Sequence, residues 1–292
     1  MPIPLTTRPV APMLGVEILG VELARTIDAQ TFEALEDALA RHALLLFRNQ
    51  SLDPETQVDF LARFGAPLIE NDGGRPFQYV SHTRDDGILG EARFAFHSDH
   101  AFMDDPIELI SLYGEEVPPG CVGTTFVNAR AAAAELPEAL HERIAARRAR
   151  HAIDPAADAS RVAIEAGPLA DDLPHAWHPA LRTCRRTGEP ILYVSEQQTD
   201  RVEGLSQEES RALLAELFAH LAQPRFRYDH AWREGDLVIW DNVALQHARG
   251  ALTSDVPRSL RRVSVGGTSV IQYFREHAER YGRGAIAAAG LS

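Results

Sequence analysis

Cysteine is scarce in this chain, and so are long apolar runs. The two cysteines among 292 residues, Cys121 and Cys184, are too few for a disulfide framework and lack the paired spacing of a zinc ribbon or redox motif. The longest clean apolar run, 43–47, is far shorter than the ~20 residues that cross a bilayer. Residues 1–15 lack the basic start and unbroken apolar stretch of an export signal. We therefore expect two reduced, buried thiols, no membrane span and a cytoplasmic location.

Positive charge is also in deficit. The chain carries 29 basic and 42 acidic residues, a formal net charge of -13. Such a charge repels nucleic acid and anionic membranes, so we expect neither as a partner. A small-molecule substrate is the expected partner instead. The sequence does not determine the oligomeric state, and a homo-oligomer (dimer or tetramer) is one option.

Periodic apolar residues indicate helices that alternate with short strands. Helical spacing over 29–42 followed by the apolar run 44–47 predicts a helix that leads into a buried strand. Pro54 predicts the first turn of a second helix, which Gly65 ends. Ser206 and Glu209 form a capping pattern ahead of another helix. Further strands are expected over 106–113, 124–127, 191–194, 226–228, 237–240 and 261–265.

The middle of the chain differs in kind. A helical stretch from Ala129 to about Arg150 is interrupted or re-started at Pro137. Residues 154–190 are rich in Pro, Ala, Asp and Gly and have no sustained period, which predicts a lid or insertion. The sequence has no internal repeat and no convincing domain boundary. We expect one domain over 1–292, with a β-rich centre and helices outside.

Three residues could hold a metal ion. His97 and Asp99 are two positions apart, and on an extended strand such side chains point to the same side. His247 follows the strand-like run 237–242. Two histidines and one carboxylate leave three adjacent coordination positions open, as iron(II) oxygenases need for a co-substrate and dioxygen. Short motifs also arise by chance, so structural histidines in unrelated places are the alternative.

Two longer motifs surround these residues, Phe96-His97-Ser98-Asp99 and Gly235-Asp236-Leu237-Val238-Ile239-Trp240-Asp241-Asn242. In their order and spacing, together with weaker matches elsewhere, the chain resembles the taurine dioxygenase and 2,4-dichlorophenoxyacetate dioxygenase family. It implies a double-stranded β-helix (jelly roll, cupin-like) with flanking helices and the metal inside one mouth, hence a β-rich α+β fold class. The weaker matches are 15–18, 20–23, 45–48, 60–65, Phe102, 117–120, Thr124, 178–179, 193–194, 203–205, 246–247, Arg258, Arg261 and Arg262.

The resemblance also implies roles for individual residues. Iron(II) is expected on the triad, where the three ligands are also the catalytic residues. Arg258, eleven residues after His247, and Thr124 match the positions that bind the distal carboxylate of 2-oxoglutarate. A planar guanidinium suits a carboxylate because it can form two parallel hydrogen bonds. The alternative for Arg258 is a surface ion pair. Trp240, Asp241 and Asn242 are expected to pack or form a turn.

Arg262 and Arg93 are the expected substrate contacts. Arg262 matches the guanidinium that holds the substrate's acid group, which predicts a carboxylate or sulfonate substrate. A salt bridge to an acidic residue of the chain is the alternative. Arg93 either adds a second positive charge or points to solvent. Departures from the family pattern at Phe96, His100 and 121–123 leave the substrate open, and no role is assigned to His100.

The implied activity is that of an Fe(II)- and 2-oxoglutarate-dependent dioxygenase with dioxygen as second co-substrate. It would oxidise, by hydroxylation, an sp³ carbon of a small anionic substrate and release succinate and CO₂. Related oxygenases that halogenate lack the carboxylate ligand, so Asp99 favours hydroxylation. Two alternatives remain: a non-catalytic cupin-like binding protein, and a zinc hydrolase with a His-Asp-His site, for which His100 is the one candidate base.

Overall fold

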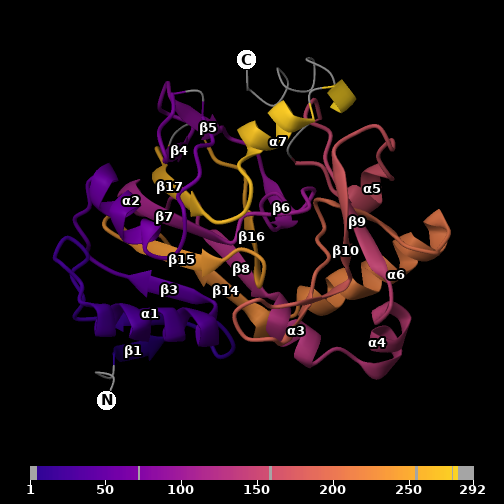
Figure 1. Cartoon of the computed structure of the whole chain (residues 1–292), viewed down its shortest axis with the longest axis horizontal. Helices are drawn as coiled ribbons and strands as arrows, with labels where there is room; N and C mark the ends of the chain where they lie inside the picture. Colours follow the sequence, from indigo (N-terminus) through magenta and orange to yellow (C-terminus); the bar gives the residue numbers. More distant parts are fainter. Residues whose placement is uncertain (1–4, 72, 158–159, 254–255, 278, 282–292) are drawn as a thin grey trace.

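The computed structural model has a β-rich α+β fold built around two large sheets (Figure 1). It describes residues 5–71, 73–157, 160–253, 256–277 and 279–281. The eight-stranded sheet has the order β1-β2-β3-β15-β7-β17-β4-β5, and the four-stranded sheet has the order β14-β8-β16-β6. The strands of the first are β1 Thr6–Pro9, β2 Val16–Leu19, β3 Leu44–Phe47, β15 Leu237–Asp241, β7 Leu109–Glu116, β17 Ser259–Val265, β4 Gln78–Ser81 and β5 Gly87–Leu89. Those of the second are β14 Arg227–His230, β8 Thr124–Asn128, β16 Leu245–Arg249 and β6 Phe94–His97.

Helices and two small sheets surround this centre. A three-stranded sheet has the order β10-β9-β13 and a two-stranded sheet pairs β11 with β12. Their strands are β9 Arg148–Ala152, β10 His175–Pro179, β13 Thr199–Val202, β11 Leu181–Thr183 and β12 Pro190–Leu192. The helices are α1 Ala29–His42, α2 Pro54–Ala62, α3 Ala129–Ala134, α4 Glu138–Ile144, α5 Ala163–Ala166, α6 Gln207–Leu221 and α7 Val270–Glu276, with a short 3₁₀ helix at Pro224–Phe226.

The helices at the start of the chain form as the apolar pattern predicts. The side chain of Asp28 caps α1, and α1 ends where Ala43 adopts a left-handed φ of 59°. Pro54 begins α2 as predicted, although α2 ends at Ala62, before Gly65. Apolar side chains of both helices pack on the eight-stranded sheet, where Phe60 meets Phe47 edge-on. The capping pair of Ser206 and Glu209 is present at α6.

The predicted helical stretch over 129–150, interrupted or re-started at Pro137, forms as α3 and α4 but is wrong at its end. Residues 148–152 form β9, which pairs with β10 and with β13. One other boundary needs correction, because the strand expected over 106–113 runs over 109–116. The segment 154–190, which has no sustained period in the sequence, contains β10, β11 and α5. β9 and β7 pair with strands far along the chain, and a local window of sequence does not contain that information.

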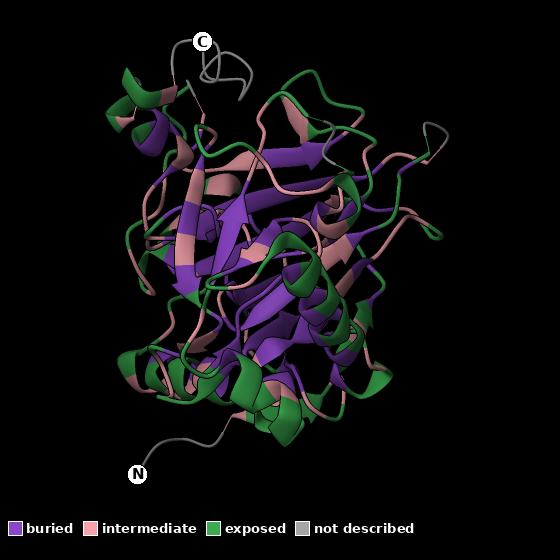
Figure 2. Ribbon diagram, turned by 90° about the vertical axis from the view of Figure 1, so that its right-hand side faces the viewer, coloured by how far each residue is buried: buried purple, intermediate pink, exposed green. Residues whose placement is uncertain are grey.

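The two large sheets enclose the candidate site. Figure 2 shows the central strands buried and the outer helices exposed on one side. All seven residues of β17 and all five of β15 are buried. β15 is accordingly almost continuously apolar, whereas β17 holds arginines that must find partners inside the protein. Within the described residues, no helix has the length and apolarity that crossing a bilayer requires.

Candidate active site

The three predicted metal ligands come together between β6 and β16. His97 ends β6 and lies directly opposite His247 in the antiparallel register. One ligand atom from each of His97, Asp99 and His247 falls within 4.8 Å of the others. The Nε2 atom of His97 is 3.1 Å from Asp99 Oδ1, and that of His247 is 3.7 Å from the same oxygen. The three groups could therefore bind one ion from adjacent corners.

The reason Asp99 faces the histidines differs from the expected one. β6 ends at His97, so Asp99 lies in a turn beyond the strand. The fully buried side chain of Asn242 fixes this turn, because its Oδ1 accepts from Asp99 N at 2.9 Å and its Nδ2 donates to Asp99 O at 3.0 Å. Asn242 also donates to Ile107 O at 2.9 Å. Asp241 accepts from the backbone N–H groups of Val243 and Ala244 in the turn after β15, so Asp241 and Asn242 are both structural, as expected.

The charges of the triad suit a cation. Burial opposes ionisation of Asp99, but His247, His97 and Arg262 outweigh it and hold the pKa of the carboxyl well below its usual range. Burial, and then His97, lower the pKa of His247 to about 3. The Nδ1 atom of His97 donates to Ala95 O at 2.8 Å, which orients the ring with Nε2 towards Asp99. Ionised carboxylate and neutral imidazole are the forms that bind metals.

A small cavity of about 50 Å³ beside the triad collects the predicted 2-oxoglutarate residues. Arg258 is 1% exposed, and its Nη2 donates to Thr124 Oγ1 at 3.2 Å. The Nε and Nη1 atoms of Arg258 have no hydrogen-bond partner among the described residues. Burial, helped by the nearby Arg249, lowers the pKa of Arg258 to about 9. A buried cation with idle donors fits a ligand carboxylate, so the surface ion pair considered for Arg258 is not formed here.

Thr124 is held in position by a residue that sequence reasoning missed. Trp232 Nε1 donates to Thr124 Oγ1 at 3.0 Å. Because the oxygen also accepts from Arg258, its own hydrogen is left to donate into the cavity. A second missed residue, Arg249, lines the same cavity and donates from Nη2 to three carbonyls, those of Leu89, Gly90 and Ala92. No sequence pattern marked either residue.

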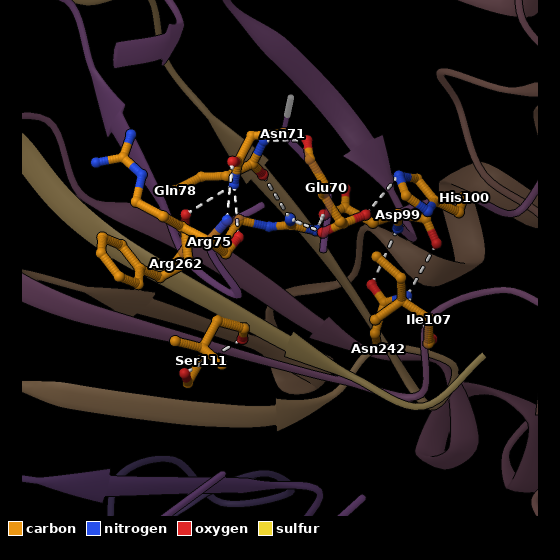
Figure 3. A network of polar contacts seen from close by, with 12 residues as sticks. Glu70, Asn71, Arg75, Gln78, Asp99, His100, Ile107, Ser111, Asn242 and Arg262 are labelled. Carbon is orange, nitrogen blue, oxygen red and sulfur yellow. Dashed lines mark hydrogen bonds and ion pairs between the residues drawn. The ribbon is translucent and has the colours of Figure 1, made fainter. Parts of the chain in front are cut away.

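The two arginines predicted to contact substrate lie in different environments. Arg262 is buried and lines both this cavity and an adjoining cavity of about 410 Å³. Its Nη2 donates to Asp99 Oδ2 at 2.9 Å, and its Nη1 donates to Glu70 Oε2 and, at 3.2 Å, to Gln78 Oε1 (Figure 3). The salt bridge weighed as the alternative for Arg262 is therefore present. Arg93 is exposed and lines neither cavity.

His100 belongs to the same polar network. Its backbone has a left-handed φ of 60°, unusual for a side chain of this size. Its Nε2 lies 3.5 Å from Glu70 Oε1. Burial lowers the pKa of His100, which leaves it neutral near pH 7. Glu70 itself was not predicted from the sequence, because no motif surrounds it.

Comparison with known proteins places the chain in a family. The model of the "Taurine catabolism dioxygenase TauD, TfdA family" matches residues 6–264. The chain belongs to the TauD/TfdA family. A 2-oxoglutarate-dependent sulfate ester dioxygenase of Pseudomonas putida is 30% identical over 276 residues, with 90% of each chain covered. The 2,4-dichlorophenoxyacetate dioxygenase of Burkholderia sp. strain RASC is 29% identical, over 88% of this chain and 92% of its own.

A solved structure agrees with this assignment. A taurine dioxygenase from Burkholderia xenovorans superposes with a TM-score of 0.76 at 28% identity, with 90% of this chain and 91% of its own covered. The protein is accordingly an Fe(II)- and 2-oxoglutarate-dependent dioxygenase with a small-molecule substrate, and it consumes dioxygen. The cupin-like binding protein and the zinc hydrolase, which the sequence had left open, receive no support.

Proposed function

We propose that His97, Asp99 and His247 bind the iron of this dioxygenase. The geometry that supports the proposal is the convergence of their ligand atoms within 4.8 Å. Asn242 holds the backbone of Asp99, and Ala95 O orients the ring of His97. Such neighbours fix the direction of metal ligands and raise their affinity for the ion.

Arg258 and Thr124 would hold the distal carboxylate of 2-oxoglutarate. The single observation that carries this assignment is the buried guanidinium of Arg258 with two idle donor atoms, next to the triad. A carboxylate placed there would accept from Arg258 and from the hydroxyl of Thr124. Iron, when bound, supplies the chemistry: oxidative decarboxylation of 2-oxoglutarate to succinate and CO₂ together with oxidation of an sp³ carbon of the substrate. The protein positions both substrates and excludes water.

The two large sheets would form the two faces of a double-stranded β-helix within one domain. Both sheets contribute to the cavity around Arg258. Ile110, Trp240 and Arg262 come from the eight-stranded sheet, while Thr124 and His247 come from the four-stranded sheet. A lid role for residues 154–190 stays a prediction, although Gln197 and Gln198, which follow them, line the larger cavity.

The acid group that the sequence predicts for the prime substrate has no free anchor at either predicted arginine. Relatives named for sulfate esters and 2,4-dichlorophenoxyacetate favour it. Arg262, however, is already paired with Glu70 and Asp99, so we do not assign it as a free anchor for an acid. Arg93 is not assigned either, because it is exposed and outside both cavities.

The proposal is tested by following ¹⁴CO₂ release from 1-¹⁴C-labelled 2-oxoglutarate. We expect CO₂ release that requires Fe(II) and dioxygen and stops when Zn²⁺ replaces iron. In Arg258→Gln the release should fall to background at the 2-oxoglutarate concentration used for the wild type. Zinc supports no redox step. Release that persists with zinc, or that Arg258→Gln leaves unchanged, would show that the assigned residues do not form the site.

A further inference from the structure

The larger cavity beside the triad differs in chemistry from the smaller one. Its volume is about 410 Å³, and its polar lining includes Glu70, Asn71, Gln78, His100 and Gln198 around Arg262. His97 and Asp99 line it as well, so a molecule held there would lie next to the proposed iron. Because the smaller cavity contains Arg258, the larger one is left for the prime substrate.

The positive charge in this cavity is already neutralised. Arg262 is 8% exposed and Glu70 4% exposed at their side chains, and they form a direct ion pair. The second Nη atom of Arg262 is committed to Asp99. An acid that used Arg262 would have to displace the Glu70 carboxylate and leave it buried without a cation. Loss of one partner from a buried ion pair is strongly unfavourable, so the pair excludes an acid from Arg262.

Two acceptor oxygens that line this cavity have no donor bonded to them in the part of the chain that the structure describes. Glu70 Oε1 and Gln198 Oε1 are buried and have no hydrogen-bond partner among the described residues. His100 Nε2 approaches Glu70 Oε1 only to 3.5 Å (Figure 3). An idle buried acceptor favours a ligand that brings an N–H or O–H group. The smaller cavity shows the reverse, since its idle atoms are the donors of Arg258.

We propose that Glu70 determines the substrate class of this enzyme, and that the prime substrate presents an amine or another N–H or O–H donor to Glu70 Oε1. The proposal rests on the proposed function only in that the triad and Arg258 must hold iron and 2-oxoglutarate. Arg262 then acts as a positioning residue that fixes the orientation of the Glu70 and Asp99 carboxylates. A neutral donor would form an ordinary hydrogen bond to Glu70 Oε1, whereas an ammonium group would form a stronger, charge-assisted hydrogen bond to the same oxygen.

A crystal of the Mn(II) and N-oxalylglycine complex tests the proposal without turnover. Crystals are soaked separately in ethylammonium chloride and in sodium acetate. We expect ethylammonium within hydrogen-bond distance of Glu70 Oε1 and no acetate at Arg262. Acetate on Arg262 with Glu70 displaced overturns the proposal, and so does a cavity that admits neither ion. Absence of N-oxalylglycine from Arg258 would instead contradict the proposed function.

A matched panel in solution gives the second test. The probes are 3-phenylpropylamine, 3-phenylpropan-1-ol and 3-phenylpropanoic acid, titrated calorimetrically into the same Mn(II) complex. We expect the amine to bind at least about tenfold more tightly than the acid. Glu70→Gln should abolish this preference, and Glu91→Gln, which changes an exposed glutamate, should keep it. If the acid binds most tightly to the wild type, or if Glu70→Gln retains the amine preference, the proposal is wrong.

Discussion

Each proposed iron ligand depends on the other two, because they share one ion and because Asp99 Oδ1 approaches both imidazoles. We predict that His97→Ala, Asp99→Ala and His247→Ala each abolish oxygen-dependent succinate formation while circular dichroism stays native. His141→Ala, at an exposed position of α4, is the control and should keep full turnover. A histidine variant of the triad that retained wild-type turnover would disprove the assigned ligand set.

Arg258 and Thr124 should contribute different amounts to the free energy of 2-oxoglutarate binding. Arg258→Gln removes one partner of a buried charge pair and should weaken 2-oxoglutarate binding by about 2–5 kcal/mol. Thr124→Val removes a neutral donor and should cost less, about 1–3 kcal/mol. Anaerobic titration of the Fe(II) protein measures both, with the exposed Arg211→Gln as control. Equal affinities in Arg258→Gln and wild type would move the anchor to another residue.

At the scale of elements, the turn after β15 connects the fold to the site, since Asn242 bonds to the backbone of both Asp99 and Ile107. Asn242→Ala should therefore lower metal affinity by about 10–100-fold. Asn128→Ala provides the comparison, because Asn128 is also buried but caps α3. That variant should lose stability and keep its metal affinity, as measured by Mn(II) titration. Similar metal affinities in the two variants would exclude an orienting role for Asn242.

The buried histidine His178, which joins β10 to the loop after Asp99, should make the stability of the protein sensitive to acid. His178 Nε2 donates to Ala101 O and Met103 O, each at 3.0 Å, and its Nδ1 accepts from Arg182 Nη1 at 3.5 Å, which requires the neutral ring. Burial, and then Arg182, lower the pKa of His178 from 6.5 to about 4. The unfolded chain binds this proton more readily, so the stabilisation is complete above pH 6.5 and declines as the pH falls towards 4.

This linkage predicts a loss of about 2 kcal/mol in unfolding free energy between pH 7.5 and pH 5 from His178 alone. Urea unfolding at the two pH values measures it. His178→Gln should be less stable at pH 7.5 but should lose about 2 kcal/mol less on acidification. An acid-induced loss as large as in wild type would show that His178 does not contribute.

The sequence was informative where a residue type has few alternative uses. His97, Asp99, His247, Thr124 and Arg258 were found because their order and spacing match the family, and the folded chain brings all five to adjoining positions. The roles of Glu70 and Trp232, and the contact of Asn242 with Asp99, could not be assigned the same way. The partners lie 192, 108 and 143 residues away, and only the folded chain brings them together. The same reason explains the missed strands β9 and β16, whose partners are also distant.

For the whole molecule, two sheets enclose two cavities of opposite character that meet at the triad. The unpaired donor atoms of Arg258 suit the smaller cavity to an anion, and the unpaired acceptor Glu70 Oε1 suits the larger cavity to a hydrogen-bond donor. The formal net charge of -13 would oppose the approach of anions, so buried guanidinium groups must supply the local attraction. The central claim is that iron and 2-oxoglutarate bind together at the triad and Arg258.

Anaerobic titration of the Fe(II) protein with 2-oxoglutarate, followed by visible absorption, tests that claim most directly. Chelation of iron by the 2-keto acid produces a charge-transfer band, whereas binding at a separate site does not. We predict a band that saturates at one 2-oxoglutarate per bound iron and is absent in His247→Ala. In Arg258→Gln the band should require far more 2-oxoglutarate. A wild-type protein that binds both Fe(II) and 2-oxoglutarate without developing the band would contradict the account.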